Sequence, residues 1–219
     1  MSELWQPLKL SLQIATAATL LTVLLGTPLA YAMARRRFPG RNVVEAFILL
    51  PLVLPPTVVG YLILMALGRG GWLTRWLGES LDYSIVFRPE GAVLAALVVA
   101  LPMLYIPAKA AFASIDRDLE DSARIMGAGR LELFWHVGIP LARRGLVSGI
   151  ILAFARALGE FGATMMVFGW QEKRLTLPIS IYADYEQGEL SHATLAVVAL
   201  SVMSLSLVLA YNATLGKRD

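Results

Sequence analysis

The strongest constraint on this chain comes from apolar stretches that are long enough to cross a lipid bilayer. Four of them contain no charged side chain: residues 10–34, 46–68, 91–108 and 193–216. A fifth, residues 145–170, is interrupted only by Arg156 and Glu160. A spanning helix needs about 20 consecutive apolar residues, and unbroken runs exclude the alternating pattern of a membrane β-barrel. The sequence therefore predicts an all-α polytopic membrane protein.

We predict five transmembrane helices in a single domain that covers residues 1–219. Their expected bounds are residues 10–34, 46–68, 91–112, 145–169 and 193–216. The composition agrees, because only 16% of the residues are charged, whereas soluble domains carry about 25%.

Composition also excludes several kinds of functional site. The chain has no cysteine, which excludes disulfides, thiolate metal sites and cysteine nucleophiles. His136 and His192 are the only histidines, and they fall in loops expected on opposite sides of the membrane. We therefore expect no catalytic residues, no metal site and no cofactor bound by this chain. The net charge of +3 is too small to indicate nucleic-acid binding.

A dense basic loop sets the predicted orientation. Between the first two spans lie Arg35, Arg36, Arg37 and Arg41. Loops on the cytoplasmic side are enriched in Lys and Arg, so this loop is predicted to be cytoplasmic. With five spans, the N-terminus and the loops 69–90 and 171–192 are then outside. The loop 113–144 and the C-terminus are expected in the cytoplasm.

The second predicted span contains three prolines, Pro51, Pro55 and Pro56. Each proline removes a backbone donor and crowds the preceding turn. The carbonyls freed in this way must be satisfied by neighbouring helices or by a water-filled path. Two interpretations stay open: a kink that serves only packing, or a broken helix that lines a pathway. In the second case Thr57 and Tyr61 could supply weak polar contacts.

The cytoplasmic loop contains a short predicted helix over residues 116–127. Asp116 can cap its N-terminus, and Gly127 can end it, because glycine takes left-handed backbone conformations at little cost. Such a helix needs a cover for its apolar stripe, which could be the protein's own helices, the membrane surface or a groove in another protein. A second amphipathic segment, residues 131–137, is expected to end before Pro140. The stripe consists of Leu119, Ala123 and Met126.

This loop resembles the coupling loop of permease subunits of bacterial ABC importers. The family pattern is E-A-A, three residues, G, nine residues and then I-x-L-P. The chain keeps this spacing with Asp121-Ser122-Ala123, Gly127, Val137 and Ile139-Pro140. Asp replaces Glu, Ser replaces the first Ala, Val replaces Ile and Ile replaces Leu. The resemblance implies docking in a cleft of a separate ATPase subunit, with candidate contact residues Glu120, Asp121, Ser122, Ala123, Gly127, Ile139 and Pro140.

Two further stretches, residues 50–71 and 153–169, are similar to the corresponding spans of molybdate importer permeases. The similarity runs over nearly the whole chain and implies import of molybdate, with tungstate as a second substrate. A dedicated tungstate permease and a sulfate/thiosulfate permease of the same superfamily are the alternatives. An autonomous secondary transporter is a more distant alternative. It would be built from inverted repeats, of which we find no convincing example in the sequence.

The resemblance also implies the rest of the assembly. The fold would be that of a type I ABC importer permease in a bacterial inner membrane. It would work as a homodimer with two cytoplasmic ABC ATPase subunits and an external oxyanion-binding protein. ATP and Mg²⁺ would bind to the ATPase, which agrees with the absence of a G-x-x-x-x-G-K-[ST] phosphate loop from this sequence.

Arg156 and Glu160 are the only charges well inside a predicted span, and they are expected to share one helical face. Charged side chains inside a membrane usually face a bundle interior or a cavity. Either Arg156 meets a divalent oxyanion in transit, or the two form a structural pair that fixes helix packing. Further candidates for the pathway or for helix packing are Pro55, Pro56, Thr57, Tyr61, Gly159, Gly162 and Thr164.

Overall fold

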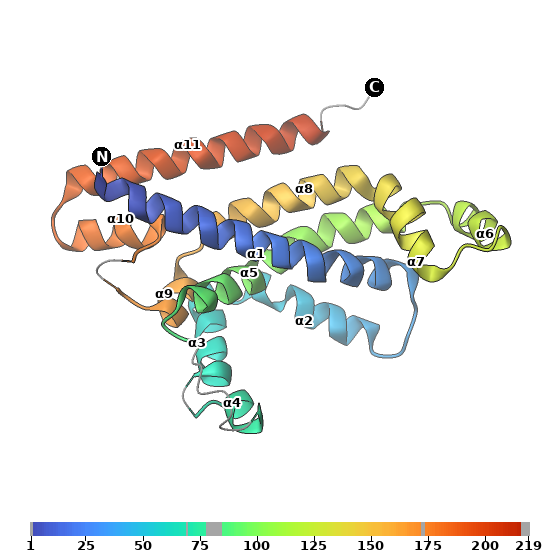
Figure 1. Ribbon diagram of the computed structural model, residues 1–219, viewed down its shortest axis with the longest axis horizontal. Helices are drawn as coiled ribbons and strands as arrows, with labels where there is room; N and C mark the ends of the chain where they lie inside the picture. The colour runs from blue at the N-terminus through green and yellow to red at the C-terminus, as the bar shows by residue number, and fades with distance from the viewer. Residues whose placement is uncertain (1, 69, 78–84, 172–173, 216–219) are drawn as a thin grey trace.

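Long apolar helices that run beside one another form the body of the protein (Figure 1). They are α1 (Ser2–Arg35), α5 (Pro89–Ala113), α8 (Ile139–Leu158) and α11 (Leu190–Leu215). The structure is a computed structural model that describes residues 2–68, 70–77, 85–171 and 174–215. Within these ranges there is no strand, and five helices are long and apolar enough to cross a membrane. The predicted all-α fold and the predicted number of spans are thus confirmed.

Small side chains hold the central helices together. The buried core between α1, α5 and α8 is rich in alanine, including Ala18, Ala96, Ala100 and Ala153, each with 0% of its surface exposed. Small residues let helix backbones approach closely, which is how membrane helices gain packing energy. A Cβ atom added to Gly149 on α8 would lie only 3.0 Å from the carbonyl oxygen of Leu104 on α5.

The second predicted span is broken at its prolines, which is one of the two interpretations left open by the sequence. It consists of α2 (Arg41–Val53) and α3 (Pro56–Leu67), and α3 leaves the direction of α2 at a steep angle (Figure 1). Leu54 is extended, with φ −70° and ψ 141°, because a residue that precedes a proline is driven out of the α region. A short helix, α4 (Trp72–Leu77), follows α3.

The fourth predicted span, residues 145–169, is not one continuous helix, and this prediction was wrong. α8 begins earlier, at Ile139, and ends at Leu158, and a separate helix α9 (Gly162–Phe168) follows. The break has a clear cause at Glu160, whose Oε1 accepts a hydrogen bond from the Ala163 N–H at 2.6 Å. A carboxylate that caps the first turn in this way favours the start of a new helix.

A further helix, α10 (Leu177–Glu186), lies in the segment predicted to be an external loop. It packs against α11 and α1, and it buries Leu177, Ile179, Ser180 and Ala183. The Leu177 N–H donates a hydrogen bond to Ser11 Oγ on α1 at 2.7 Å. The apolar side chains of this short helix are scattered among polar ones, so the sequence pattern does not distinguish it from a loop.

Candidate functional site

The predicted loop helix is present as α6 (Arg117–Ile125). Asp116 Oδ1 accepts a hydrogen bond from the Asp118 N–H at 3.1 Å, which confirms the expected N-cap. Gly127 follows the helix with φ +95°, a left-handed conformation that glycine adopts without strain. Together with α7 (Arg130–Glu132), the helix lies at one end of the molecule, beyond the ends of α1 and α5 (Figure 1).

An apolar surface on this loop is left uncovered by the chain. Its most exposed side chains are Ile125 at 88% and Met126 at 82%. Beside it is a shallow depression of about 370 Å³, lined by Ala123, Met126, Gly127, Ala128, Glu132, His136 and Val137. The described helices therefore do not cover the predicted stripe. Of the three covers considered for this stripe, the membrane surface and another protein remain. We call this uncovered apolar surface the loop surface. It consists of Leu119, Ala123, Ile125, Met126, Gly127, Leu131, Trp135 and Val137.

The residues of the family pattern divide between this surface and the helix that follows. Ala123 and Gly127 line the depression. Asp121 and Ser122 are exposed beside it, and Asp121 Oδ1 accepts a hydrogen bond from Arg124 at 3.1 Å. Ile139 and Pro140 lie apart, in the first turn of α8.

Glu120 points into the protein. The prediction that Glu120 contacts a partner ATPase is therefore corrected. Its side chain is only 5% exposed, and its Oε1 lies 2.8 Å from Arg35 Nε at the end of α1. Arg35 also donates a hydrogen bond through Nη2 to the Ile115 carbonyl oxygen at 3.1 Å. The pair therefore ties α6 to the end of a membrane helix, because a buried carboxylate needs a charged or hydrogen-bonding partner.

An aromatic cluster lies beneath the loop and completes this attachment. The Tyr31 ring on α1 makes edge-on contacts with Phe112 on α5 and Phe134, each with ring centroids 5.2 Å apart. Phe134 belongs to a π-helical turn, η1 (Leu133–Gly138). Gly138 allows the close approach, since a Cβ atom there would lie 3.2 Å from the Tyr31 ring.

The second amphipathic segment does not end before Pro140, contrary to the prediction. It continues through η1 directly into α8, with Pro140 in the first turn of that helix. Proline is tolerated in the first turn of a helix, and π-helical turns occur as single turns within longer helices. The loop surface and α8 are thus parts of one continuous helical segment.

The two helix breaks lie side by side, where α3 packs against α9. A Cβ atom on Gly162 would lie 3.2 Å from both Pro56 and Thr57. Two of the candidate pathway residues here are exposed, Thr57 and Tyr61, whereas Thr164 is only 1% exposed. The structure therefore brings Pro56, Thr57 and Gly162 together, as neighbours across the two breaks.

Arg156 and Glu160 form a direct ion pair, with Arg156 Nη1 2.5 Å from Glu160 Oε2. The Glu160 side chain is 1% exposed, and that of Arg156 is 26% exposed. The sequence predicts that Glu160 lies on the same helix as Arg156. In the structure, Glu160 lies in the break between α8 and α9, where it also caps α9. This geometry favours the structural interpretation of the pair, because both charges are already compensated. Among the described residues, no group of three or more His, Cys, Asp or Glu could hold a metal ion.

Comparison with known proteins places this architecture in a family. Residues 26–215 match the family described as binding-protein-dependent transport system inner membrane component. The chain belongs to this family. The match covers the last third of α1 and every later element described above, including the loop surface and both helix breaks.

Relatives of this chain include permease proteins of molybdenum and sulfate transport systems. The chain is 36% identical over 208 residues to the molybdenum transport system permease protein ModB of Escherichia coli (strain K12), covering 94% of this chain and 91% of that protein. It is 34% identical over 204 residues to the sulfate transport system permease protein CysW of Synechococcus elongatus, covering 93% of this chain and 71% of that protein.

A solved structure with the same fold is a bacterial alginate ABC transporter in complex with an alginate pentasaccharide-bound periplasmic protein. Its TM-score is 0.74 at 20% identity, covering 94% of this chain and 76% of that chain. The fold of this inner membrane component is therefore that of ABC importer permeases, as the loop pattern implied.

Sequence reasoning missed the role of Arg35 and the π-helical turn. Arg35 is one of several arginines in a basic run, and nothing in that run indicates which of them reaches Glu120. The acidic pair at 120 and 121 contained the available signal, since adjacent helix residues point about 100° apart and do not face the same surroundings.

Proposed function

We propose that this chain is the membrane-spanning permease subunit of an ATP-driven importer of molybdate, with tungstate as a second substrate. The observation that supports this most directly is the exposed loop surface, which is anchored from within by Arg35 and Glu120. A permease needs such a surface to receive motion from a motor protein. The identity with ModB over most of both chains supports molybdate as the substrate.

The motor is a separate protein in this proposal. The sequence has no phosphate-binding loop, so ATP and Mg²⁺ bind to two ABC ATPase subunits that dock on two loop surfaces of a permease homodimer. An external oxyanion-binding protein delivers the substrate from the other side. The basic loop at residues 35–41 and the loop surface are cytoplasmic, and the N-terminus is outside, according to the enrichment of Lys and Arg.

Closure of the two ATPase subunits moves the loop surfaces toward each other. Because η1 continues into α8, the motion of the loop reaches the break at residues 159–161 and, through α9, the packed end of α3. Arg35 and Glu120 carry the same motion to α1. The two breaks are the points at which these helices change direction, so that one side of the pathway closes while the other opens.

Sulfate import is the second candidate function, because the chain is also 34% identical to CysW. Sulfate and molybdate are both tetrahedral divalent oxyanions, and no described contact discriminates between them. In the molybdate proposal the selection of the anion is made by the external binding protein.

The test is uptake of labelled molybdate by cells that lack this gene, with and without the gene restored. Excess unlabelled tungstate and, separately, excess sulfate are added as competitors. We expect the restored uptake to be blocked by tungstate and unaffected by sulfate. Full competition by sulfate, or restoration of sulfate uptake alone, would replace the molybdate assignment with the sulfate one.

A further inference from the structure

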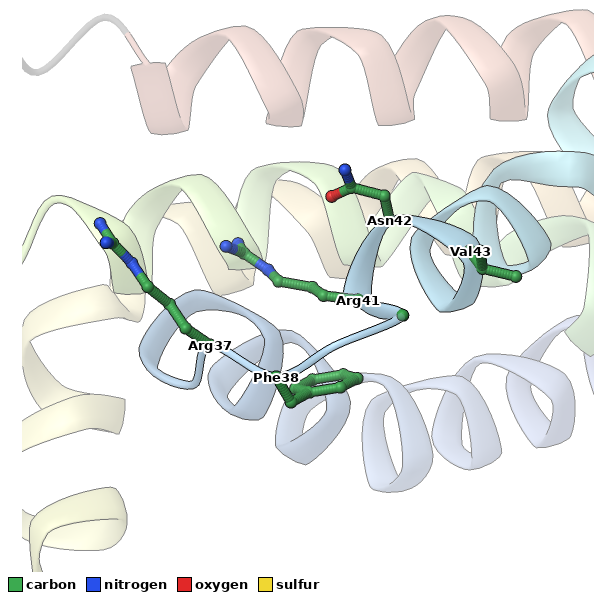
Figure 2. A pocket seen from close by; sticks show the side chains of 6 residues that line it. Arg37, Phe38, Arg41, Asn42 and Val43 are labelled. Carbon is green, nitrogen blue, oxygen red and sulfur yellow. The ribbon is translucent and has the colours of Figure 1, made fainter.

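The turn between α1 and α2 contains a basic depression that the transport mechanism does not use. It has a volume of about 380 Å³ and is lined by Arg37, Phe38, Gly40, Arg41, Asn42 and Val43 (Figure 2). Gly40 has φ +82°, which allows the chain to reverse tightly and bring the end of α1 close to the start of α2.

The arginines of this turn have no ion-pair partner among the described residues, although Glu45 attracts Arg41 at longer range. Of the acidic side chains nearby, Glu120 is paired with Arg35, and Glu45 is paired with Lys109. Among the described residues, no carboxylate lies within 4 Å of Arg36, Arg37 or Arg41. Of these three, Arg37 and Arg41 line the depression, so their guanidinium groups can pair with an anion from outside the chain.

Two of these arginines point in similar directions beside the depression. The side chains of Arg37 and Arg41 run in similar directions, and their guanidinium groups lie on the same side of the turn (Figure 2). The Nε atom of Arg41 is buried and has no hydrogen-bond acceptor, which is unfavourable for a charged donor. Guanidinium groups bind phosphate oxygens in paired hydrogen bonds, so a phosphate would satisfy this donor.

Phe38 and Val43 line the depression, and Phe47 follows about one turn after Val43 on α2. Val43 and Phe47, on the first two turns of α2, are 59% and 69% exposed, and Phe38 is 41% exposed. An inorganic oxyanion makes no favourable contact with apolar side chains, whereas a phospholipid has a charged headgroup next to an acyl chain that can contact them. Clusters of Lys and Arg that directly follow a membrane helix are known to attract anionic lipids.

We propose that the α1–α2 turn is a binding site for the phosphate of an anionic phospholipid. Arg37 and Arg41 hold the phosphate group, and the apolar side chains of Phe38, Val43 and Phe47 contact the upper part of the acyl chains. The site fixes the end of α1, and hence Arg35, at the membrane surface. It depends on the membrane topology of α1 and α2 and does not depend on which anion is transported.

The test is native mass spectrometry of the purified full-length chain, titrated with phosphatidylglycerol or with phosphatidylcholine of the same acyl chains. The unaltered chain should bind phosphatidylglycerol in preference. The double variant Arg37→Gln/Arg41→Gln should lower its association constant by roughly tenfold. The matched control is Arg143→Gln/Arg144→Gln, which removes two exposed arginines from the start of α8 and should leave the preference unchanged.

Three results would overturn the proposal. The unaltered chain could show no preference for phosphatidylglycerol, a result that does not depend on how any variant folds. The control could lose as much affinity as the double variant, in which case only the general surface charge acts. Inorganic phosphate or molybdate could displace phosphatidylglycerol at equal concentration, in which case the depression takes free anions.

Discussion

Arg35 and Glu120 join a membrane helix to a loop through one pair of charged side chains. Both are nearly buried, at 10% and 5% exposure of the side chain. Removal of one partner from such a pair leaves an uncompensated charge and costs about 3–5 kcal/mol, although the intact pair adds little net stability. The pair therefore contributes to the structure mainly by holding α6 in a single orientation relative to α1.

Single substitutions at this pair should stop transport, and a charge exchange should partly restore it. We expect Arg35→Glu and Glu120→Arg each to abolish molybdate uptake, because each places two like charges in contact. The double variant Arg35→Glu/Glu120→Arg restores an attractive pair and should recover a measurable part of the uptake. Asp118→Asn, on the exposed side of the same helix, is the control and should transport normally.

Uptake is compared at equal amounts of permease in the membrane, measured by immunoblot. If the exchanged pair transports no better than either single variant, electrostatic pairing is not what links α6 to α1.

At the scale of elements, the glycines at the helix crossings decide how closely the broken helices pack. A Cβ atom on Gly60 of α3 would lie 2.7 Å from Met166 Cβ and 2.8 Å from the backbone of Ala163, both on α9. Contacts this short force the backbones apart, since neither neighbour is the end of a flexible side chain. The crossing of α3 and α9 therefore requires glycine at this position.

Gly60→Ala should destabilise the protein by about 1–3 kcal/mol, the usual cost of overpacking a tight contact. Gly159→Ala is the matched control, because the nearest atom to its added Cβ would be the Ala155 carbonyl oxygen at 3.6 Å. We expect a lower thermal unfolding midpoint for purified Gly60→Ala and an unchanged midpoint for Gly159→Ala. Equal midpoints for the two variants would show that α3 and α9 are not held at this crossing.

At the scale of the whole molecule, the loop surface lies at the end where α1, α5 and α8 come together (Figure 1). A membrane helix can expose apolar side chains to lipid, but α6 carries charged residues throughout and lies beyond the ends of the long helices. This arrangement favours a protein partner for Ile125 and Met126 over the membrane surface.

Replacement of Ile125 and Met126 by serine should separate folding from assembly. Both side chains are more than four-fifths exposed, at 88% and 82%, so the free energy of unfolding should change by no more than about 0.5 kcal/mol. Co-purification of the ATPase subunit should nevertheless be lost. Tyr185→Ser, at an equally open position (64% exposed) on α10, is the control and should retain the ATPase.

The result contradicts the proposed function if the ATPase still co-purifies with the serine variant. A large fall in the unfolding midpoint would instead mean that the chain itself covers these side chains.

Much of the candidate site could be predicted from the sequence because local interactions determine it. The cap at Asp116, the left-handed turn at Gly127 and the exposed apolar stripe all depend on residues within a few positions of each other. The break at Pro55 and Pro56 is also local, since proline removes its own donor. The break at Glu160 was missed, because a carboxylate in an apolar stretch can either pair along a helix or cap a new one, and only the surrounding packing selects between them.

The sequence by itself determined the class of fold, the number of membrane-crossing helices and the loop surface, because long apolar runs and short-range capping depend on neither partner nor packing. Only the tertiary structure decided that Glu120 faces Arg35, that η1 carries the loop into α8, and that the two helix breaks meet at Gly162. These features join residues that are far apart in the chain, and their free energy comes from contacts that exist only after the helices have packed.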